Sequence, residues 1–433
     1  MKPLIAGDRA NDPLVRHFRQ IMVWPVQVLP PNGGDAIGRP WEVLERTEGH
    51  PWREVDDEFT GDPRDFQARH YHEFVTFLPH VQRFLYGDEL TRSRTGAYGE
   101  SPMRVFRRHD VARVRAWLGE DPMPCIFHVA HIDLHFFSDL DLAILALEIH
   151  ADQVPLSRAI DALYSLGRAY PAYWTADGTP GNCARRVEWL SEGGDVLAVS
   201  DYEQQQAYLA YVCEHRAPRL ATHWAFLMQP FASGDDRQAT GPRLRQLEYY
   251  RMPVLGYLAF DDPRELTRAD FVRLTFAGPP GGRDDMPYAS AYLRNFERRF
   301  CYDRDWTPGS RRQPMRFLCC GHAFAAVGSA SCDYFTDAET GVLGQFRHEL
   351  FLLGLIAHFH KASLLMLSDR LTSAISRLDI EDEHSLTQFR STIRRTLETF
   401  LRFTHRYWFH EVADNARARE LFRLWREDRK STR

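Results

Sequence analysis

Two long segments near the end of the chain carry apolar residues at alternating spacings of three and four. The first gives ten such positions from Phe346 to Leu378, nine of them apolar, with His360 as the exception. The second runs from Leu386 to Tyr407. This spacing is typical of the seam through which one helix packs against another. The sequence therefore predicts two long helices, about 343–378 and 385–410.

An acidic connection, Asp379 to Glu383, joins these two helices. A connection this short favours antiparallel neighbours. We expect a helical hairpin with a short terminal helix over residues 341–433, and His360 beside Phe403 or Tyr407 as a core histidine with one hydrogen bond. The second helix also carries a basic stripe, for which a solvated face is the favoured interpretation. A surface for acidic partners or lipid head groups is the alternative. The stripe consists of Arg390, Arg394, Arg395, Arg402 and Arg406.

Strand patterns dominate the preceding region, residues 1–340. The segment Leu142 to Ile149 is nearly all apolar, as in a central strand covered on both faces. The segment Ile21 to Leu29 also has strand character, and Pro25 within it favours an edge strand or a bend. We predict a further strand at His223 to Met228 and helical segments within 62–85 and 157–166. The expected fold is an α/β or α+β domain with a mixed sheet, followed by the hairpin.

Composition excludes some classes of protein. The net charge is −5 over 433 residues, which argues against a strongly basic nucleic-acid binder. No apolar run approaches the ~20 residues that a membrane-spanning helix needs. The seven cysteines contain no CxxC pair and indicate reduced thiols in a cytoplasmic protein. A location at the membrane periphery stays open.

Several segments together resemble the cytoplasmic part of CorA-like divalent-cation transporters. The resemblance covers most of the chain through diffuse segments, with no catalytic signature. These segments are Trp24 to Pro30, Arg83 to Gly87, His131 to Phe137, Ile144 to Ile149, Thr404 to Val412 and Ala418 to Trp425.

In that family an N-terminal α/β domain leads into a long stalk helix and then into two membrane spans, with a Gly-Met-Asn motif at the pore mouth. This chain contains neither the motif nor a span. The resemblance therefore implies a soluble, cation-responsive module, with Mg²⁺ or another divalent cation as its ligand and no transport by this chain alone. It also implies a homo-oligomer formed through the C-terminal helices, with a membrane-associated partner as a further option.

Histidines and aspartates crowd one predicted strand and its end. On an extended strand His131, Asp133 and His135 share one face. Imidazole and carboxylate ligands suit zinc or another transition metal. Asp139 and Asp141 follow and add the oxygen ligands that Mg²⁺ prefers. We therefore name these five residues as the candidate metal site, although polar side chains on a solvated strand face are the commoner arrangement.

Motifs of nucleophilic catalysis are missing from the sequence. There is no GxSxG elbow and no Walker A loop. The first hypothesis is therefore a non-enzymatic module with a cation-sensing or oligomerisation role. The second is a soluble metal-dependent enzyme that uses His131, Asp133 and His135.

Overall fold

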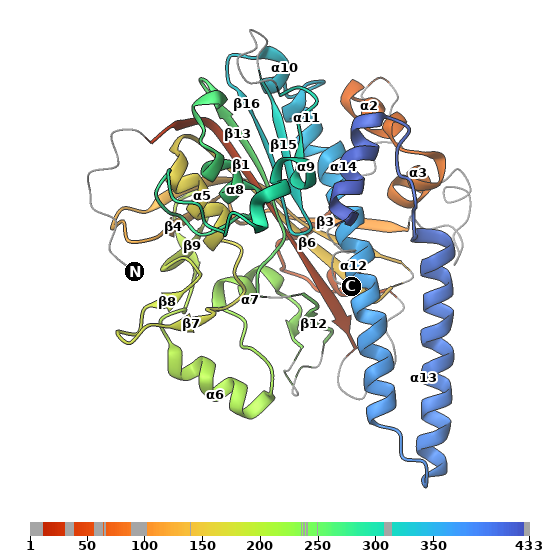
Figure 1. The fold of residues 1–433 in the computed structure, drawn as a ribbon. Coiled ribbons are helices and arrows are strands. Elements are labelled where there is room, and N and C mark those ends of the chain that lie inside the picture. The colour runs from red at the N-terminus through yellow and green to blue at the C-terminus, as the bar shows by residue number, and fades with distance from the viewer. Residues whose placement is uncertain are drawn as a thin grey trace.

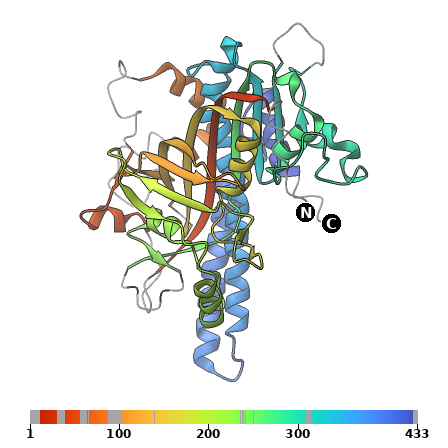
Figure 2. The same cartoon turned by 90° about the vertical axis from the view of Figure 1, so that its left-hand side faces the viewer.

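The computed structural model describes residues 12–30, 39–55, 64, 66–87, 102–138, 140–234, 236, 239, 241–248, 250–306 and 314–427. Figures 1 and 2 show a large twisted sheet with helices on both of its faces and a two-helix hairpin that projects from one end. A mixed sheet followed by a helical hairpin is the predicted fold class, which is thereby confirmed.

Strand β1 (Leu14–Leu29) lies in the middle of the sheet. It pairs with β6 (Leu142–Pro155) along almost its whole length. On its other side it pairs first with β13 (Val254–Phe260), up to Met22, and then with β12 (Arg243–Gln246), from Val26. The edge position predicted from Pro25 is therefore wrong. The proline lies where one neighbour ends and the next begins, so its missing N–H removes no bond from the ladder.

The described residues form one sheet of fourteen strands, whose main order is β10-β9-β4-β5-β6-β1-β13-β16-β15-β14. Two very short strands, β7 and β8, pair separately. The bounds of the remaining strands are β2 Trp52–Glu54, β3 Met103–Arg108, β4 Arg113–Trp117, β5 Cys125–Phe137, β7 Tyr173–Trp174, β8 Pro180–Gly181, β9 Arg186–Leu190, β10 Val196–Val199, β11 Ala232–Ser233, β14 Cys301–Tyr302, β15 Arg316–Cys320 and β16 Ala323–Ser329.

Helices cover the sheet on both faces, each over its own apolar core. One core contains side chains of α5, α7, α8 and α9. The other contains side chains of α3, α11, α12 and α14, where Trp425 stacks on Phe324 with ring centroids 4.8 Å apart. The bounds are α1 Glu42–Arg46, α2 Ala68–Thr76, α3 Pro79–Tyr86, α5 Leu156–Ser165, α6 Gln205–His215, α7 Thr222–Met228, η3 Pro263–Glu265, α8 Arg268–Phe276, η4 Tyr292–Asn295, α9 Phe296–Phe300 and α10 Asp333–Thr336.

The C-terminal helices are α11 (Val342–Arg347), α12 (Glu349–Ser376), α13 (Glu383–Arg402) and α14 (Ala416–Glu427). The first predicted helix is thus broken at His348, and the second ends in a π-helical segment, Phe403–Tyr407. The first half of α12 is buried against β1 and β6, whereas its second half pairs with α13 outside the sheet. The seam of the first helix therefore packs largely on the sheet rather than on the second helix.

Two predictions about single elements had different outcomes. His223 to Met228 is helix α7 rather than a strand, because the apolar run packs one helical face into the core through Trp224 and Leu227. The sequence also predicts a helix from about Leu266 with Thr267 or Asp262 as its cap: Thr267 caps α8 in a reciprocal capping box with Asp270, whereas Asp262 caps the short helix η3. All seven cysteines are free.

Candidate functional site

The three central residues of the predicted metal site lie on β5 beneath the junction of α11 and α12. The solvated face favoured for them is wrong, because Asp133 is 5% exposed and His135 is 4% exposed. The ring of His135 contacts that of Phe351 on α12, which covers this part of the sheet. Periodicity alone could not reveal this cover, since the alternation along β5 is the same whether the polar face meets water or a helix.

Asp133 is engaged by an arginine on the neighbouring strand. The Arg107 guanidinium donates to both carboxylate oxygens at 2.8 Å. Burial is the largest influence on Asp133 and opposes its ionisation, but the Arg107 hydrogen bonds together with the interactions with His131, Arg107 and His135 outweigh it and lower the pKa of the carboxyl below its ordinary value. Asp133 is therefore an ionised partner of Arg107, and each of its oxygens accepts a hydrogen bond from that guanidinium.

Glu148 on β6 is fully buried and is the centre of a second group of ionisable side chains, whose other members are partly buried. Its Oε1 accepts from Arg19 Nη1 at 2.7 Å and from Arg347 Nε at 3.2 Å. Its Oε2 lies 3.3 Å from Nδ1 of His131. Burial is the largest influence on His131 and lowers the pKa of its imidazole, despite the two nearby carboxylates. The cluster is thus a buried ionic layer between the sheet and α11.

The other predicted ligands are placed elsewhere. Nδ1 of His135 lies 3.3 Å from the Ile144 carbonyl oxygen, and Asp141 forms an ion pair with Arg370 of α12. Asp139 lies outside the described residues. Within the described segments, no three His, Cys, Asp or Glu side chains are grouped so that they could hold a metal ion. The metal site therefore stays a prediction from the sequence.

The break between α11 and α12 lies at His348, and this residue and its two neighbours, Arg347 and Glu349, reach three different partners. Arg347 turns to Glu148 in the ionic layer, and Nδ1 of His348 lies 3.0 Å from Glu73 of α2. Nδ1 of His72 lies 2.5 Å from Glu349. The helix is interrupted at His348, whose backbone leaves the helical region at φ −119° and ψ −89°. These contacts fasten α2 to the N-terminus of α12.

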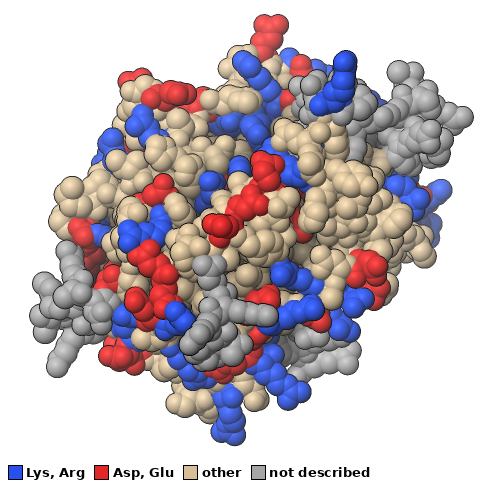
Figure 3. Space-filling model, turned by 90° about the horizontal axis from the view of Figure 1, so that it is seen from above, with Lys and Arg blue, Asp and Glu red and all other residues tan. Residues whose placement is uncertain are grey.

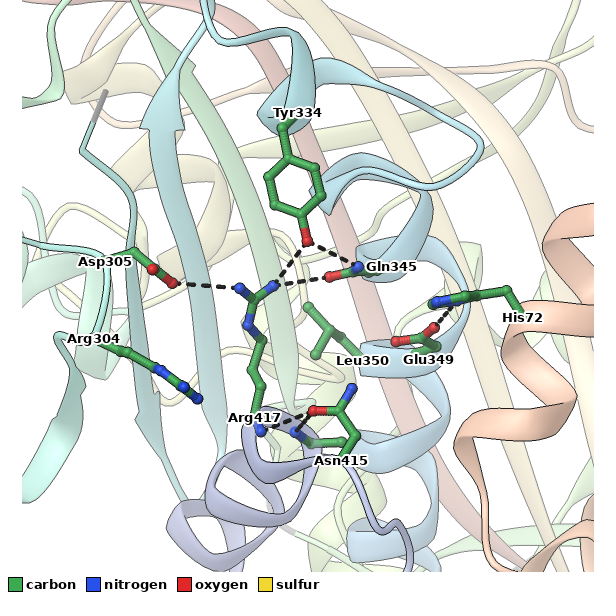
Figure 4. Close-up of a pocket in the computed structure, with 10 residues that line it drawn as sticks. His72, Arg304, Asp305, Tyr334, Gln345, Glu349, Leu350, Asn415 and Arg417 are labelled. Carbon is green, nitrogen blue, oxygen red and sulfur yellow. Dashed lines mark hydrogen bonds and ion pairs between the residues drawn. The ribbon is translucent and has the colours of Figure 1, made fainter. Parts of the chain in front are cut away.

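A pocket of about 470 Å³ opens beside this junction. Figure 4 shows the His72 and Glu349 pair on one side and Arg417 on the other, with Leu350 between them. Arg417 is fixed by the Tyr334 hydroxyl and the Gln345 side-chain carbonyl, each at 3.2 Å. The lining residues are His72, Arg304, Asp305, Tyr334, Gln345, Glu349, Leu350, Asn415, Arg417 and Ala418.

The pocket combines groups of both signs. Asp305 lies 3.4 Å from Arg417, and burial raises the pKa of Glu349, although His72 opposes this. Figure 3 shows the molecule from above, and on the described part of this upper face basic and acidic side chains are likewise interspersed. A paired histidine and glutamate can accept a proton, but the lining holds no serine, cysteine or lysine nucleophile. Sequence reasoning missed this pocket because its residues come from separate segments that no motif connects.

The projecting half of the hairpin exposes large apolar side chains. On α12, Leu371 is 40% exposed and Ile375 is 62% exposed; on α13, Leu397 is 53% exposed. Leu364 and Leu401 are also exposed. We call these five residues the hairpin face. Thr396 is the one residue of α13 that is buried, so the fold covers α13 very little.

The hairpin face is continuous across both helices. On each helix an exposed leucine comes directly after a buried residue in the sequence. Leu364 comes after buried Ser363 on α12, and Leu397 comes after buried Thr396 on α13. Successive residues of a helix point about 100° apart. In two antiparallel right-handed helices, the residues that come directly after the buried ones therefore point to the same side of the pair. Ala362 and Met366, on the opposite side of α12, belong to the apolar core. The face therefore points away from the body of the molecule.

Charge is unevenly distributed along the hairpin. The tip carries Asp379, Glu381, Asp382 and Glu383, with Asp382 capping α13. The base carries Arg402 and Arg406, both exposed. The tip of the hairpin is thus mainly acidic, whereas α13 carries further exposed arginines, Arg390, Arg394 and Arg395, towards the basic end at Arg402 and Arg406.

Comparisons with known proteins add no relative: no family model, no curated protein and no solved structure matches the chain. The CorA-like resemblance therefore stays a prediction. Within the part of the chain that the structure describes, the stretch 342–376, which comprises α11, the break at His348 and α12, is long and apolar enough to cross a membrane, but 83% of its most apolar part is buried inside the fold. Such burial is consistent with the core helix of a soluble protein.

Proposed function

We propose that this protein is a self-associating module in which two copies pair through the hairpin face. The supporting observation is the line of exposed leucine and isoleucine side chains on the side of the hairpin turned away from the body. Soluble proteins rarely leave such a contiguous apolar surface uncovered. Packing two such faces together makes a four-helix bundle, which buries the apolar stripe of every helix.

The charges on the hairpin favour antiparallel pairing of the two copies. In a parallel pair the acidic tips would meet and repel each other. In an antiparallel pair the tip residue Glu381 of one copy approaches the base residues Arg402 and Arg406 of the other. The same face then serves both copies, as two-fold symmetry requires.

Sedimentation equilibrium of purified protein tests this proposal. We expect a wild-type mass near twice 50.3 kDa. The double variant Leu371→Glu, Leu397→Glu should sediment as a monomer with an unchanged far-UV spectrum, because both side chains are exposed. Leu209→Glu is the matched control, since Leu209 is 44% exposed on α6, away from the hairpin. A monomeric wild type, or a dimeric double variant, contradicts the proposal.

Orientation is tested by charge reversal. Glu381→Lys alone should weaken the dimer by placing like charges together, and Glu381→Lys with Arg406→Glu should restore it. Restoration is not expected in a parallel pair, where the tip and base of the two copies never meet. Binding of the wild type to anionic vesicles in place of dimerisation would reassign the face to a membrane surface.

Cation sensing and metal-dependent catalysis remain proposals from the sequence. Repeating the sedimentation with Mg²⁺ and then with a chelator tests the first, which requires a change in mass. Elemental analysis tests the second, which requires stoichiometric zinc or iron bound at His131, Asp133 and His135. We favour the oligomerisation role, because Arg107 already donates to both oxygens of Asp133.

A further inference from the structure

Two arginines lie side by side on the face of the sheet that carries α5 and α8. Arg168 and Arg251 form an isolated antiparallel β-bridge, flanked by hydrogen bonds from Ala169 N to Tyr250 O and from Met252 N to Gly167 O. Residues directly opposite each other in such a bridge direct their side chains to the same side, and like charges there are destabilising. The repulsion between these two guanidinium groups needs a physical explanation.

Each guanidinium group donates hydrogen bonds from one of its edges to the carbonyl oxygens at the end of a helix. Nε of Arg168 donates to the Tyr164 carbonyl oxygen at the end of α5, at 2.7 Å. Nη2 of Arg251 donates to the carbonyl oxygens of Phe276 and Ala277 at the end of α8, both at 2.5 Å. Cations are favourable at helix C-termini. These bonds leave the remaining N–H groups of both arginines unexplained.

The remaining groups find no anion in the described part of the chain. Arg168 is 2% exposed, and neither arginine interacts with any described carboxylate. Nε of Arg251 is buried and has no hydrogen-bond acceptor among the described residues. Burial, and then the neighbouring Arg251, lower the pKa of Arg168 to about 10, so it still carries its charge at neutral pH. Unpaired buried charge is costly, which is why buried charges normally have partners.

Aromatic residues complete the surroundings. The Arg168 guanidinium lies over the rings of Tyr164 and Tyr250, with centroids at 4.7 and 5.1 Å. Tyr288, 37% exposed, lies on the Arg251 side of the cluster, and Arg251 itself is half-buried, whereas Arg168 is buried. Tyrosine hydroxyls and guanidinium forks are the donors that recognise tetrahedral oxyanions.

We propose that Arg168 and Arg251 together bind the phosphate group of a small molecule, at a site separate from the hairpin. A phosphate dianion matches the two positive charges and offers enough oxygens to bridge two guanidinium groups. A carboxylate carries one charge and two oxygens, so it satisfies the pair less completely. Helix capping holds both arginines in place before the ligand arrives.

The experiment measures the thermal midpoint of the full chain against inorganic phosphate, with sodium chloride at matched ionic strength and with sodium acetate in parallel. We expect phosphate alone to raise the midpoint of the wild type in a saturable manner. Arg251→Gln should abolish that rise, and Arg251→Lys should weaken phosphate binding about tenfold or more, because lysine lacks the planar fork. Arg294→Gln, which removes an exposed arginine on nearby η4, should leave the response unchanged.

Three results would overturn the site. The first is a wild type that responds equally to phosphate and chloride. The second is an Arg251→Gln protein that keeps the full phosphate response. The third is a response to acetate and not to phosphate. If Arg251→Gln fails to fold, the lysine variant and the wild-type titration decide the question, and neither depends on whether the hairpin pairs.

Discussion

Nε2 of His360 and the backbone carbonyl oxygen of Tyr407 lie 2.6 Å apart, and this hydrogen bond ties α12 to the end of α13 at the base of the hairpin. His360 is fully buried among the rings of Phe403, Trp408 and Phe409. The position and the bond agree with the prediction from the seam. The contact also fixes the level at which the two helices meet.

Replacing His360 by leucine should therefore destabilise the fold. The change leaves the Tyr407 carbonyl oxygen without its donor in a buried place, which costs about 1–3 kcal/mol. Urea denaturation followed by far-UV circular dichroism measures the loss. His405→Leu, on the exposed side of the same segment, is the control and should change stability by less than about 0.5 kcal/mol. Equal losses in the two variants would contradict the role of the bond.

The ionic layer predicts a large effect at Glu148. Glu148→Gln removes the one carboxylate that faces Arg19, Arg347 and His131 together, and leaves the charges of two partly buried arginines uncompensated. We expect a loss of about 3–5 kcal/mol in the free energy of unfolding. Glu398→Gln is the control, because its pair with Arg394 on α13 is exposed and contributes well under about 1 kcal/mol. A Glu148→Gln protein as stable as this control would show that the layer does not hold α11 to the sheet.

Acid should weaken the fold partly through His135. Burial lowers the pKa of His135 from 6.5 to about 4, so the folded protein keeps this imidazole neutral. Between these values the unfolded chain takes up a proton that the folded chain does not, and stability falls as the pH drops from about 6.5 towards 4. At about 1.4 kcal/mol per pKa unit, the full effect is on the order of 3 kcal/mol.

The measurement is the free energy of unfolding at pH 7 and at pH 4.5 for the wild type and for His135→Leu. The variant should lose less stability on acidification, since the other titrating groups are common to both proteins. An identical pH dependence in the two proteins would count against a neutral, buried His135.

Pro25 supplies a test of the sheet. Pro25 lies at the gap between β13 and β12, so Pro25→Ala removes no hydrogen bond. It should change the free energy of unfolding by no more than about 1 kcal/mol, because alanine gives the unfolded chain more conformational freedom than proline. Val23→Pro is the contrasting variant, since Val23 N donates to the Pro253 carbonyl oxygen at 2.8 Å. It should cost about 3 kcal/mol or more. Thermal melts of both variants measure the difference, and a tolerated Val23→Pro would mean that the register of β1 is different.

The sequence predicted what local patterns determine and missed what tertiary contacts determine. The hairpin, the buried strand β6 and the capping box of Thr267 follow from spacing and residue type. The break at His348 does not, and the residues around it contact Glu148, Glu73 and His72, three partners far away in the sequence. The same holds for the site residues. His131, Asp133 and His135 share a strand face as predicted, but the cover by α12 and the pairing with Arg107 appear only in the folded chain.

The mass of the wild-type protein in solution tests the central claim most directly. Light scattering coupled to size exclusion should give a mass near twice 50.3 kDa for the wild type and near 50.3 kDa for Leu371→Glu, Leu397→Glu. A wild-type mass of 50.3 kDa at all accessible concentrations would contradict pairing through the hairpin face.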